Sequence, residues 1–237
     1  MSIKDSLAEV NRRIGEASRR AGRGPSEIIL VAVTKNVPVE RIRQAVDAGV
    51  MILGENRVQE AASKVEKIGV AGGKGVTWHM VGHLQSNKVK KAVAIFDAIQ
   101  SVDSFDLAAE VDKRAAEAGK LIDVLVEINA SGEASKFGAR PEESVDVVGR
   151  MSHLRHISVR GLMTIGALTD DERAIRACFR SLHDLREQIL KADFEKVRMD
   201  YLSMGMTSDF EIAIEEGSNM VRIGTAIFGP REDLPAT

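Results

Sequence analysis

Eight short apolar runs alternate with amphipathic segments along this sequence, and that alternation limits the fold more strongly than any other feature. The apolar runs, which predict strands, are residues 28–34, 51–55, 77–81, 98–102, 122–129, 160–165, 201–204 and 220–228. Helical spacing predicts helices at 39–48, 57–68, 86–93, 105–118, 141–152, 171–191 and 209–216, after an extra N-terminal helix. Strands separated by helices pair in parallel through right-handed crossovers, and eight of them close a (β/α)8 TIM barrel. An open doubly wound sheet is the structural alternative.

The composition fits a single barrel and disfavours polyanion binding. The 237 residues match the length at which such barrels fold as one unit, so we expect one domain over residues 1–237. Aromatic residues make up only 4% of the sequence, and aliphatic side chains must therefore fill most of the core. The 33 Lys and Arg against 35 Asp and Glu give a net charge of −2, which offers no long-range field for nucleic acid or an anionic membrane.

Three further features favour a cytoplasmic protein. No apolar run approaches the roughly 20 residues needed to span a bilayer. The first residues mix acidic and apolar side chains at helical spacing, unlike a signal or transit peptide. The single cysteine, Cys178, cannot form an internal disulfide, which favours a reducing compartment.

Because the helix faces show no apolar surplus, we expect a monomer.

Lys35 closes the first apolar run and is the first candidate functional residue. Val31 and Val33 lie on the same face of the predicted strand, so the ammonium group faces a partly apolar wall. Desolvation disfavours the charged form of an amine and makes it available as a nucleophile toward an aldehyde carbon. The carboxyl ends of barrel strands carry catalytic groups. A solvated or salt-bridged lysine is the alternative.

The last two strands predict a phosphate site. Barrels frequently bind phosphate with the loops that follow strands seven and eight. Ser203 supplies a hydroxyl, while Gly205 and Gly224 let backbone N–H groups approach phosphate oxygens without a Cβ in the way. Alternatively, the glycines serve tight turns and the hydroxyl satisfies local backbone groups. Their joint occurrence in the two expected loops favours phosphate.

Arg222 lies on the predicted last strand, next to the first, and shares the central cavity with Lys35. A buried arginine needs an acceptor, and a pyridine nitrogen is one. Because guanidinium stays protonated, it keeps that nitrogen unprotonated and weakens the ring as an electron sink. The competing interpretation is a surface salt bridge with Glu55 or Asp209.

Other sequence motifs give weaker evidence of a functional site. His79 and His83 stand four apart on a strand and turn instead of a helix, so we expect no metal site. The glycine-rich stretch 69–75 precedes a strand and lacks the lysine-serine pair of a P-loop, which predicts a flexible connection. Glu60 with Lys64 is an i,i+4 pair of the kind that marks an exposed helix face.

Six segments together closely resemble the pyridoxal phosphate homeostasis protein family (YggS/PROSC type), and the match spans nearly the whole chain. They are the lysine strand, 54–60 (GENRVQE), 78–88 (WHMVGHLQSNK), 135–138 (SKFG), 160–164 (RGLMT) and 203–206 (SMGM). That family is similar to the N-terminal barrel of bacterial alanine racemases and eukaryotic ornithine decarboxylases. Phe137 occupies a position where relatives vary.

The resemblance implies that pyridoxal 5′-phosphate (PLP) is the cofactor, held as an internal aldimine on Lys35. It further implies the cofactor-binding residues Asn56, His79, Met163, Ser203, Gly205, Arg222, Gly224 and Thr225. Ser203, Gly224 and Thr225 hold the phosphate, Arg222 faces the pyridine nitrogen, and Asn56, His79 and Met163 line the ring. Lys136 is a candidate for a second PLP transfer route, with surface solvation as its alternative. PLP-dependent apoenzymes are possible partners.

The family lacks an established reaction, and the residues agree with a carrier or regulator of PLP and amino-acid balance. A two-base racemase needs a second acid/base on the opposite ring face, and the only tyrosine, Tyr201, is expected in the core. A site open to water also loses the positioning and desolvation that drive carbanion chemistry. A PLP-dependent racemase or decarboxylase remains the alternative, and an aldolase-like barrel acting on a phosphorylated metabolite is a third hypothesis.

Overall fold

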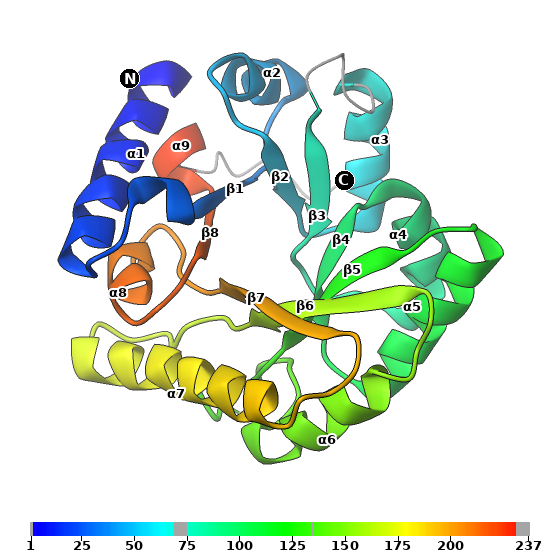
Figure 1. Cartoon of the computed structure of the whole chain (residues 1–237). Helices are drawn as coiled ribbons and strands as arrows, with labels where there is room; N and C mark the ends of the chain where they lie inside the picture. Colours follow the sequence, from blue (N-terminus) through cyan, green and yellow to red (C-terminus); the bar gives the residue numbers. More distant parts are fainter. Residues whose placement is uncertain (1, 69–74, 134, 231–237) are drawn as a thin grey trace.

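The apolar runs form a closed parallel barrel with helices on its outside (Figure 1). The computed structural model describes residues 2–68, 75–133 and 135–230. Within these ranges the barrel strands are β1 (Ile29–Val33), β2 (Ile52–Glu55), β3 (Thr77–Met80), β4 (Ala98–Val102), β5 (Ile122–Glu127), β6 (Ile157–Met163), β7 (Val197–Ser203) and β8 (Met220–Ile223). Each pairs in parallel with the next, and β8 returns to β1. The predicted TIM barrel is confirmed.

The helices fall between the strands, as their spacing predicts. They are α1 (Ile3–Arg20), α2 (Val39–Asp47), α3 (Val58–Ile68), α4 (Val89–Ile95), α5 (Phe105–Glu117), α6 (Pro141–Met151), α7 (Glu172–Lys191), α8 (Phe210–Glu215) and α9 (Thr225–Phe228). Two short 3-10 turns, η1 (Pro25–Glu27) and η2 (Ser86–Lys88), precede β1 and α4. Every helix that the sequence predicts therefore has a counterpart in the structure.

The extra N-terminal helix α1 is capped and packed. Ser2 and Asp5 form a capping box, which satisfies backbone N–H groups at the start of the helix. One face of α1 buries Leu7 and Val10, and the helix contacts α8 and α9 (Figure 1). Arg13 on α1 makes an ion pair with Glu211 on α8, with Nη2 2.7 Å from Oε2. The helix therefore covers the seam where the last strand meets the first.

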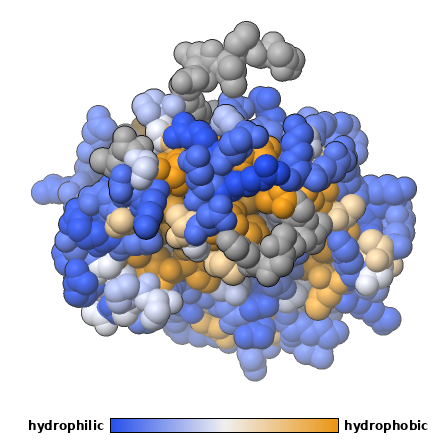
Figure 2. Space-filling view, turned by 90° about the horizontal axis from the view of Figure 1, so that it is seen from above, coloured by the Kyte–Doolittle hydropathy of each residue, from blue (hydrophilic) through white to orange (hydrophobic). Residues whose placement is uncertain are grey.

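Two apolar regions stabilise the barrel. The larger lies between strands and helices and contains big buried side chains such as Trp78, Phe179 and Phe210. The smaller lies inside the barrel, around Val31 and Met220. The face that carries α1, α2 and α3 is largely hydrophilic, with hydrophobic residues visible in the gaps (Figure 2). Among the described residues, no helix is long and apolar enough to cross a membrane.

The largest differences from the predicted strand boundaries are in β6, β7 and β8. β8 was expected to run to 228 but ends at Ile223, and α9 begins at Thr225, because Gly224 adopts φ −117° and ψ −73°, outside the β region. β6 and β7 begin earlier than expected, because charged side chains interrupt the apolar pattern: Arg160 on β6 and Asp200 on β7. The Arg160 guanidinium is satisfied by Asp123 and Asp200 at 3.0 and 2.8 Å. The glycine-rich stretch 69–75 lies outside the described residues except for its last residue.

Candidate cofactor-binding site

A cavity of about 350 Å³ lies at the carboxyl end of the barrel, the end that carries the active site in TIM-barrel enzymes. Its volume falls at the lower end of the range for small-molecule sites, about 300–1,000 Å³. The lining residues are Val33, Asn56, Val81, Ile165, Met206, Thr207, Ser208, Arg222, Gly224 and Thr225. Four residues that the sequence predicts are thus brought together: Asn56, Arg222, Gly224 and Thr225.

A wider cavity of about 900 Å³ lies at the opposite end of the barrel. It is lined by the residues that lead into β6 and β7, including Arg155, Phe194 and Lys196. The amino-terminal end of a TIM barrel is associated with stability, whereas the carboxyl end carries chemistry. We therefore take the smaller cavity as the functional site.

Lys35 lies in the tight turn that follows β1. The Val37 N–H donates to the Thr34 carbonyl at 2.9 Å and closes the turn. Asn36 adopts φ +60°, the left-handed conformation that asparagine tolerates better than most residues. The Lys35 side chain is half-buried and is not among the residues that line the cavity, although Val33, two residues earlier, is. The structure thus places Lys35 in a turn two residues beyond the cavity lining, at the carboxyl end of β1.

A buried ion cluster lies behind this turn. The Lys64 ammonium donates to Glu55 Oε1 at 2.6 Å and to Glu60 Oε1 at 2.7 Å. The prediction that Glu60 and Lys64 form an exposed pair is wrong for Lys64, whose side chain is only 7% exposed. Helix α3 packs beside β2, so its inner face meets the buried Glu55. Burial raises the pKa of Glu55, while the Lys64 charge opposes that rise.

Arg222 is buried inside the barrel with main-chain and side-chain acceptors. Nη1 donates to the Ser203 carbonyl at 2.7 Å and to the Ser203 hydroxyl at 2.8 Å, and Nη2 donates to the Thr164 carbonyl at 2.8 Å. Burial lowers the Arg222 pKa to about 10, while Glu127 and Asp209 act at longer range in the opposite direction. The competing interpretation of a surface salt bridge is therefore wrong, because the residue is 4% exposed.

Ser203 belongs to a polar chain inside the barrel. Its hydroxyl donates to Gln100 Oε1 at 2.6 Å, and the Gln100 amide nitrogen lies 2.8 Å from His79 Nδ1. With the amide oriented by Ser203, His79 Nδ1 accepts, which assigns the ring proton to Nε2. Burial lowers the His79 pKa to about 4. Neither Ser203 nor His79 lines the cavity. The pattern of apolar runs did not identify Gln100 as part of this polar chain.

Gly205 and Met163 also lie away from the cavity wall. Gly205 has φ +94°, and a Cβ there would lie 2.6 Å from Ala213 Cβ, so this glycine serves the close packing of α8. Met163 is fully buried at the end of β6. The hydroxyls that do reach the cavity from the β7 loop are those of Thr207 and Ser208, which the sequence prediction missed. The sequence could have indicated these two residues, because they follow the predicted Ser203 in the same loop.

Asn56 lines the cavity and carries a buried polar atom without a hydrogen-bond partner. Its Oδ1 is buried and has no hydrogen-bond partner in the described part of the chain. Gly82 packs against this residue, and a Cβ there would lie 2.6 Å from the Asn56 carbonyl oxygen. The backbone of Asn56 is thus fixed at the cavity lining. An unsatisfied buried acceptor is costly unless a ligand or water completes it.

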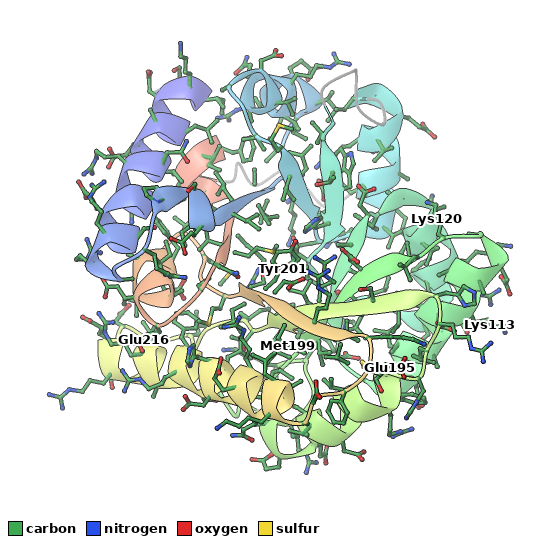
Figure 3. All side chains as sticks on the ribbon, viewed as in Figure 1. Lys113, Lys120, Glu195, Met199, Tyr201 and Glu216 are labelled. Atoms are coloured by element: carbon green, nitrogen blue, oxygen red, sulfur yellow. The ribbon has the colours of Figure 1, made fainter. Side chains whose placement is uncertain are left out.

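Tyr201 is engaged inside the barrel. It lies on β7 (Figure 3) and packs with Val31 and Met220. The Arg160 guanidinium carbon lies 5.3 Å from the centroid of its ring. Tyr201 is half-buried, so it packs against the interior cluster without being enclosed by it as a core residue would be. Among the described residues, no group of three or more His, Cys, Asp or Glu side chains is arranged to hold a metal ion.

The barrel and its site define a class of protein: a barrel of the alanine racemase N-terminal type, with a polar cavity at its carboxyl end. The family model for the alanine racemase N-terminal domain matches residues 6–232. An alanine racemase from Clostridium difficile shares the fold, with a TM-score of 0.74 and 19% identity over 94% of this chain and 56% of that one. The chain belongs to the pyridoxal phosphate homeostasis protein family.

Two relatives carry that assignment. The pyridoxal phosphate homeostasis protein of Pasteurella multocida is 43% identical over 98% of this chain and 99% of its own length. PipY of Synechococcus elongatus, solved with PLP bound, is 34% identical with a TM-score of 0.84, over 96% of this chain and all of its own. The resemblance inferred from the six sequence segments is confirmed.

Proposed function

We propose that this protein binds PLP in the carboxyl-end cavity and contributes to the homeostasis of PLP and amino acids. One observation carries the proposal: a cavity of suitable size at the carboxyl end of the barrel is lined by Asn56, Arg222 and hydroxyl-bearing residues of two loops, next to the Lys35 turn. The curated name of the Pasteurella relative and the PLP-bound structure of PipY support it.

The residues divide by their chemistry. Thr207, Ser208, Gly224 and Thr225, from the β7 and β8 loops, are the phosphate ligands, because they supply hydroxyls and accessible backbone N–H groups. Lys35 supplies the amine that attaches the cofactor's aldehyde carbon. When bound, PLP would supply an electron sink for negative charge that develops at the α-carbon of an amine condensed with it.

Arg222 and Asn56 tune and orient the ring. Nη1 and Nη2 of Arg222 are engaged with main-chain and hydroxyl oxygens, and the residue lines the cavity. A guanidinium facing the pyridine nitrogen keeps that nitrogen unprotonated and so limits the ring's capacity as an electron sink. Asn56 lines the same cavity and supplies an amide side chain to orient the ring.

We further propose that the protein is a monomeric, cytoplasmic carrier or regulator, formed by one barrel domain, without robust catalysis. Tyr201 is packed in the barrel interior and is not available as a second base. The alanine racemase with the same fold matches this chain over only 56% of its length. The roles of His79, Met163, Ser203 and Gly205 are indirect, because they shape or support the site from behind its lining.

The first test is spectroscopic. Protein saturated with PLP is expected to show the visible-violet absorption band of an imine, and Lys35→Ala is expected to abolish it. Borohydride reduction followed by peptide mapping is expected to place the label on Lys35.

Lys136→Ala is the matched control. The Lys136 ammonium is held by Glu133 Oε1 at 2.6 Å and by the Gly166 carbonyl at 2.9 Å, so this variant is expected to keep the band. A colourless protein in excess PLP, or a label on another lysine, contradicts the proposal. Turnover of a panel of amino acids at enzymatic rates contradicts the carrier role alone.

A further inference from the structure

The main chain on both sides of Lys35 is held by side chains from other elements. Before it, the Thr34 carbonyl accepts from the Lys64 ammonium at 2.5 Å in addition to the turn N–H of Val37. After it, the Asn36 N–H donates to Glu60 Oε1 at 2.6 Å. A single turn of helix α3 thus supplies both contacts, because residues 60 and 64 stand four apart on one helix face.

Of the two holding side chains, Lys64 is itself tied to β2, and Glu60 is tied to Lys64. Lys64 donates to Glu55 Oε1 at 2.6 Å, and the Thr34 hydroxyl donates to the same oxygen at 2.5 Å. Glu55 directly precedes Asn56, which lines the cavity. The cluster of Glu55, Glu60 and Lys64 therefore lies behind two residues of the proposed PLP site at once.

A buried cluster of charges contributes little net stability to a fold. The side chains of Glu55 and Lys64 are 0% and 7% exposed, and Glu55 Oε2 has no hydrogen-bond partner in the described residues. Burying charges costs desolvation that their attraction often fails to recover, and apolar residues of similar volume are commonly as stable or more so. Stability alone therefore does not account for the cluster, whereas a need for fixed geometry does.

The turn also carries local strain that the cluster offsets. Asn36 has φ +60°, a conformation disfavoured for residues with a Cβ. Positive φ at the third residue of a hydrogen-bonded turn directs the second residue, here Lys35, to a defined side of the chain. Because Glu60 accepts the Asn36 N–H, it stabilises this conformation over alternatives that would turn Lys35 elsewhere.

We propose that Glu60 and Lys64 act as positioning residues that hold the Lys35 turn in the orientation in which its amine reaches an aldehyde bound in the cavity. Glu60 fixes the residue after Lys35, and Lys64 fixes the residue before it. This inference rests on the proposed PLP function and names the residues that prepare its covalent step.

Glu60→Ala is the test variant, because it removes the contact to Asn36 while the buried pair of Lys64 and Glu55 stays intact. The rate of covalent labelling of Lys35, followed as growth of the absorption band at fixed PLP, is expected to fall by about tenfold, the effect of losing a hydrogen bond to a charged group. Glu60→Gln keeps an acceptor oxygen and is expected to restore the rate to within about twofold of wild type.

Two controls separate positioning from folding. Glu66→Ala changes an exposed glutamate on the same helix and is expected to leave the rate unchanged. Pyridoxine 5′-phosphate, which has no aldehyde, is expected to bind Glu60→Ala as it binds wild type, since the cavity lining is untouched. Glu60→Asp, which withdraws the carboxylate by one methylene, is the second variant should Glu60→Ala fail to fold, and it is expected to slow labelling in the same way.

The outcomes are distinguishable. If wild type forms no adduct at Lys35, the proposed function fails. If wild type labels normally and Glu60→Ala or Glu60→Asp labels at the same rate, the positioning role is overturned. An equal loss of labelling and of pyridoxine 5′-phosphate affinity also overturns it, because the residue then acts only through the fold.

Discussion

Glu127, at the end of β5, is a buried acid that the sequence reading did not single out. Its side chain is 4% exposed, and its Oε2 has no hydrogen-bond partner in the described residues. Burial, assisted by the nearby charge of Asp103, raises its pKa to about 7, and Arg222 opposes the rise. The protonated carboxyl therefore fits the barrel interior better than the carboxylate does.

This environment predicts a pH-dependent stability. A carboxyl whose pKa is raised in the folded state stabilises the fold below about pH 4.5, and that contribution is lost as pH rises through about 7. Glu127→Gln resembles the protonated form, so we expect equal stability near pH 5 and a gain of up to about 3 kcal/mol near pH 8. Urea unfolding at both pH values measures this difference.

Glu142→Gln, at an exposed position in the first turn of α6, serves as the comparison. It is expected to change the free energy of unfolding by the same amount at both pH values. Equal effects of the two substitutions at pH 8 would show that burial at position 127 does not penalise the charge.

At the residue scale, sequence reasoning succeeded where position along a strand determines position in the barrel. Lys35 and Arg222 follow from strand ends and from the adjacency of the first and last strands, which the pairing of Val31 with Arg222 confirms. The role of Ser203 in phosphate binding stays a prediction. Its hydroxyl donates to Gln100 and the residue does not line the cavity, which the pattern could not show because the facing of the last residues of a strand is ambiguous.

Among the elements, β6 and β7 approach each other at a glycine. Gly161 pairs with Tyr201, and a Cβ on Gly161 would lie 1.9 Å from the Tyr201 carbonyl oxygen. The register also shifts between Val159 and Gly161, which marks an irregularity in the pairing. The close approach therefore depends on the missing side chain.

Gly161→Ala is expected to destabilise the protein by about 3 kcal/mol or more, because backbone cannot move aside cheaply. Gly15→Ala, within α1, is the matched substitution: the nearest atoms to its Cβ are 3.6 and 3.7 Å away, so it is expected to stabilise the helix by about 0.5–1 kcal/mol. Chemical unfolding of both variants measures whether the two changes in stability have opposite signs. Destabilisation of equal size in both would contradict the explanation from the close approach of β6 and β7.

For the whole molecule, the closing contact is the pairing of β8 with β1. It brings the Lys35 turn and the Arg222 strand together from opposite ends of the chain, and α1 packs over the outside of this seam through α8 and α9 (Figure 1). A ligand held by residues from β1, β2, β7 and β8 loops therefore couples the two ends of the chain.

Binding at this seam predicts ligand-dependent stability. PLP at about a hundred times its dissociation constant is expected to stabilise the fold by about 2.7 kcal/mol, which raises the melting temperature by about 5–10 °C for a chain of this size. Inorganic phosphate at the same concentration is expected to give a smaller rise, and Lys35→Ala to reduce the PLP effect. A melting temperature that PLP leaves unchanged would show that the ligand does not bind the native barrel.

The sequence by itself determined the architecture, because the alternation of apolar runs and helices admits few parallel folds and the count of eight favours closure. It also placed Lys35, Asn56, Arg222, Gly224 and Thr225 at the functional end. Only the tertiary structure decided which hydroxyls reach the cavity, that Lys64 is buried, and that Glu60 holds the turn after Lys35. These features depend on contacts between side chains that lie far apart in the sequence or on helix faces whose neighbours no local pattern specifies.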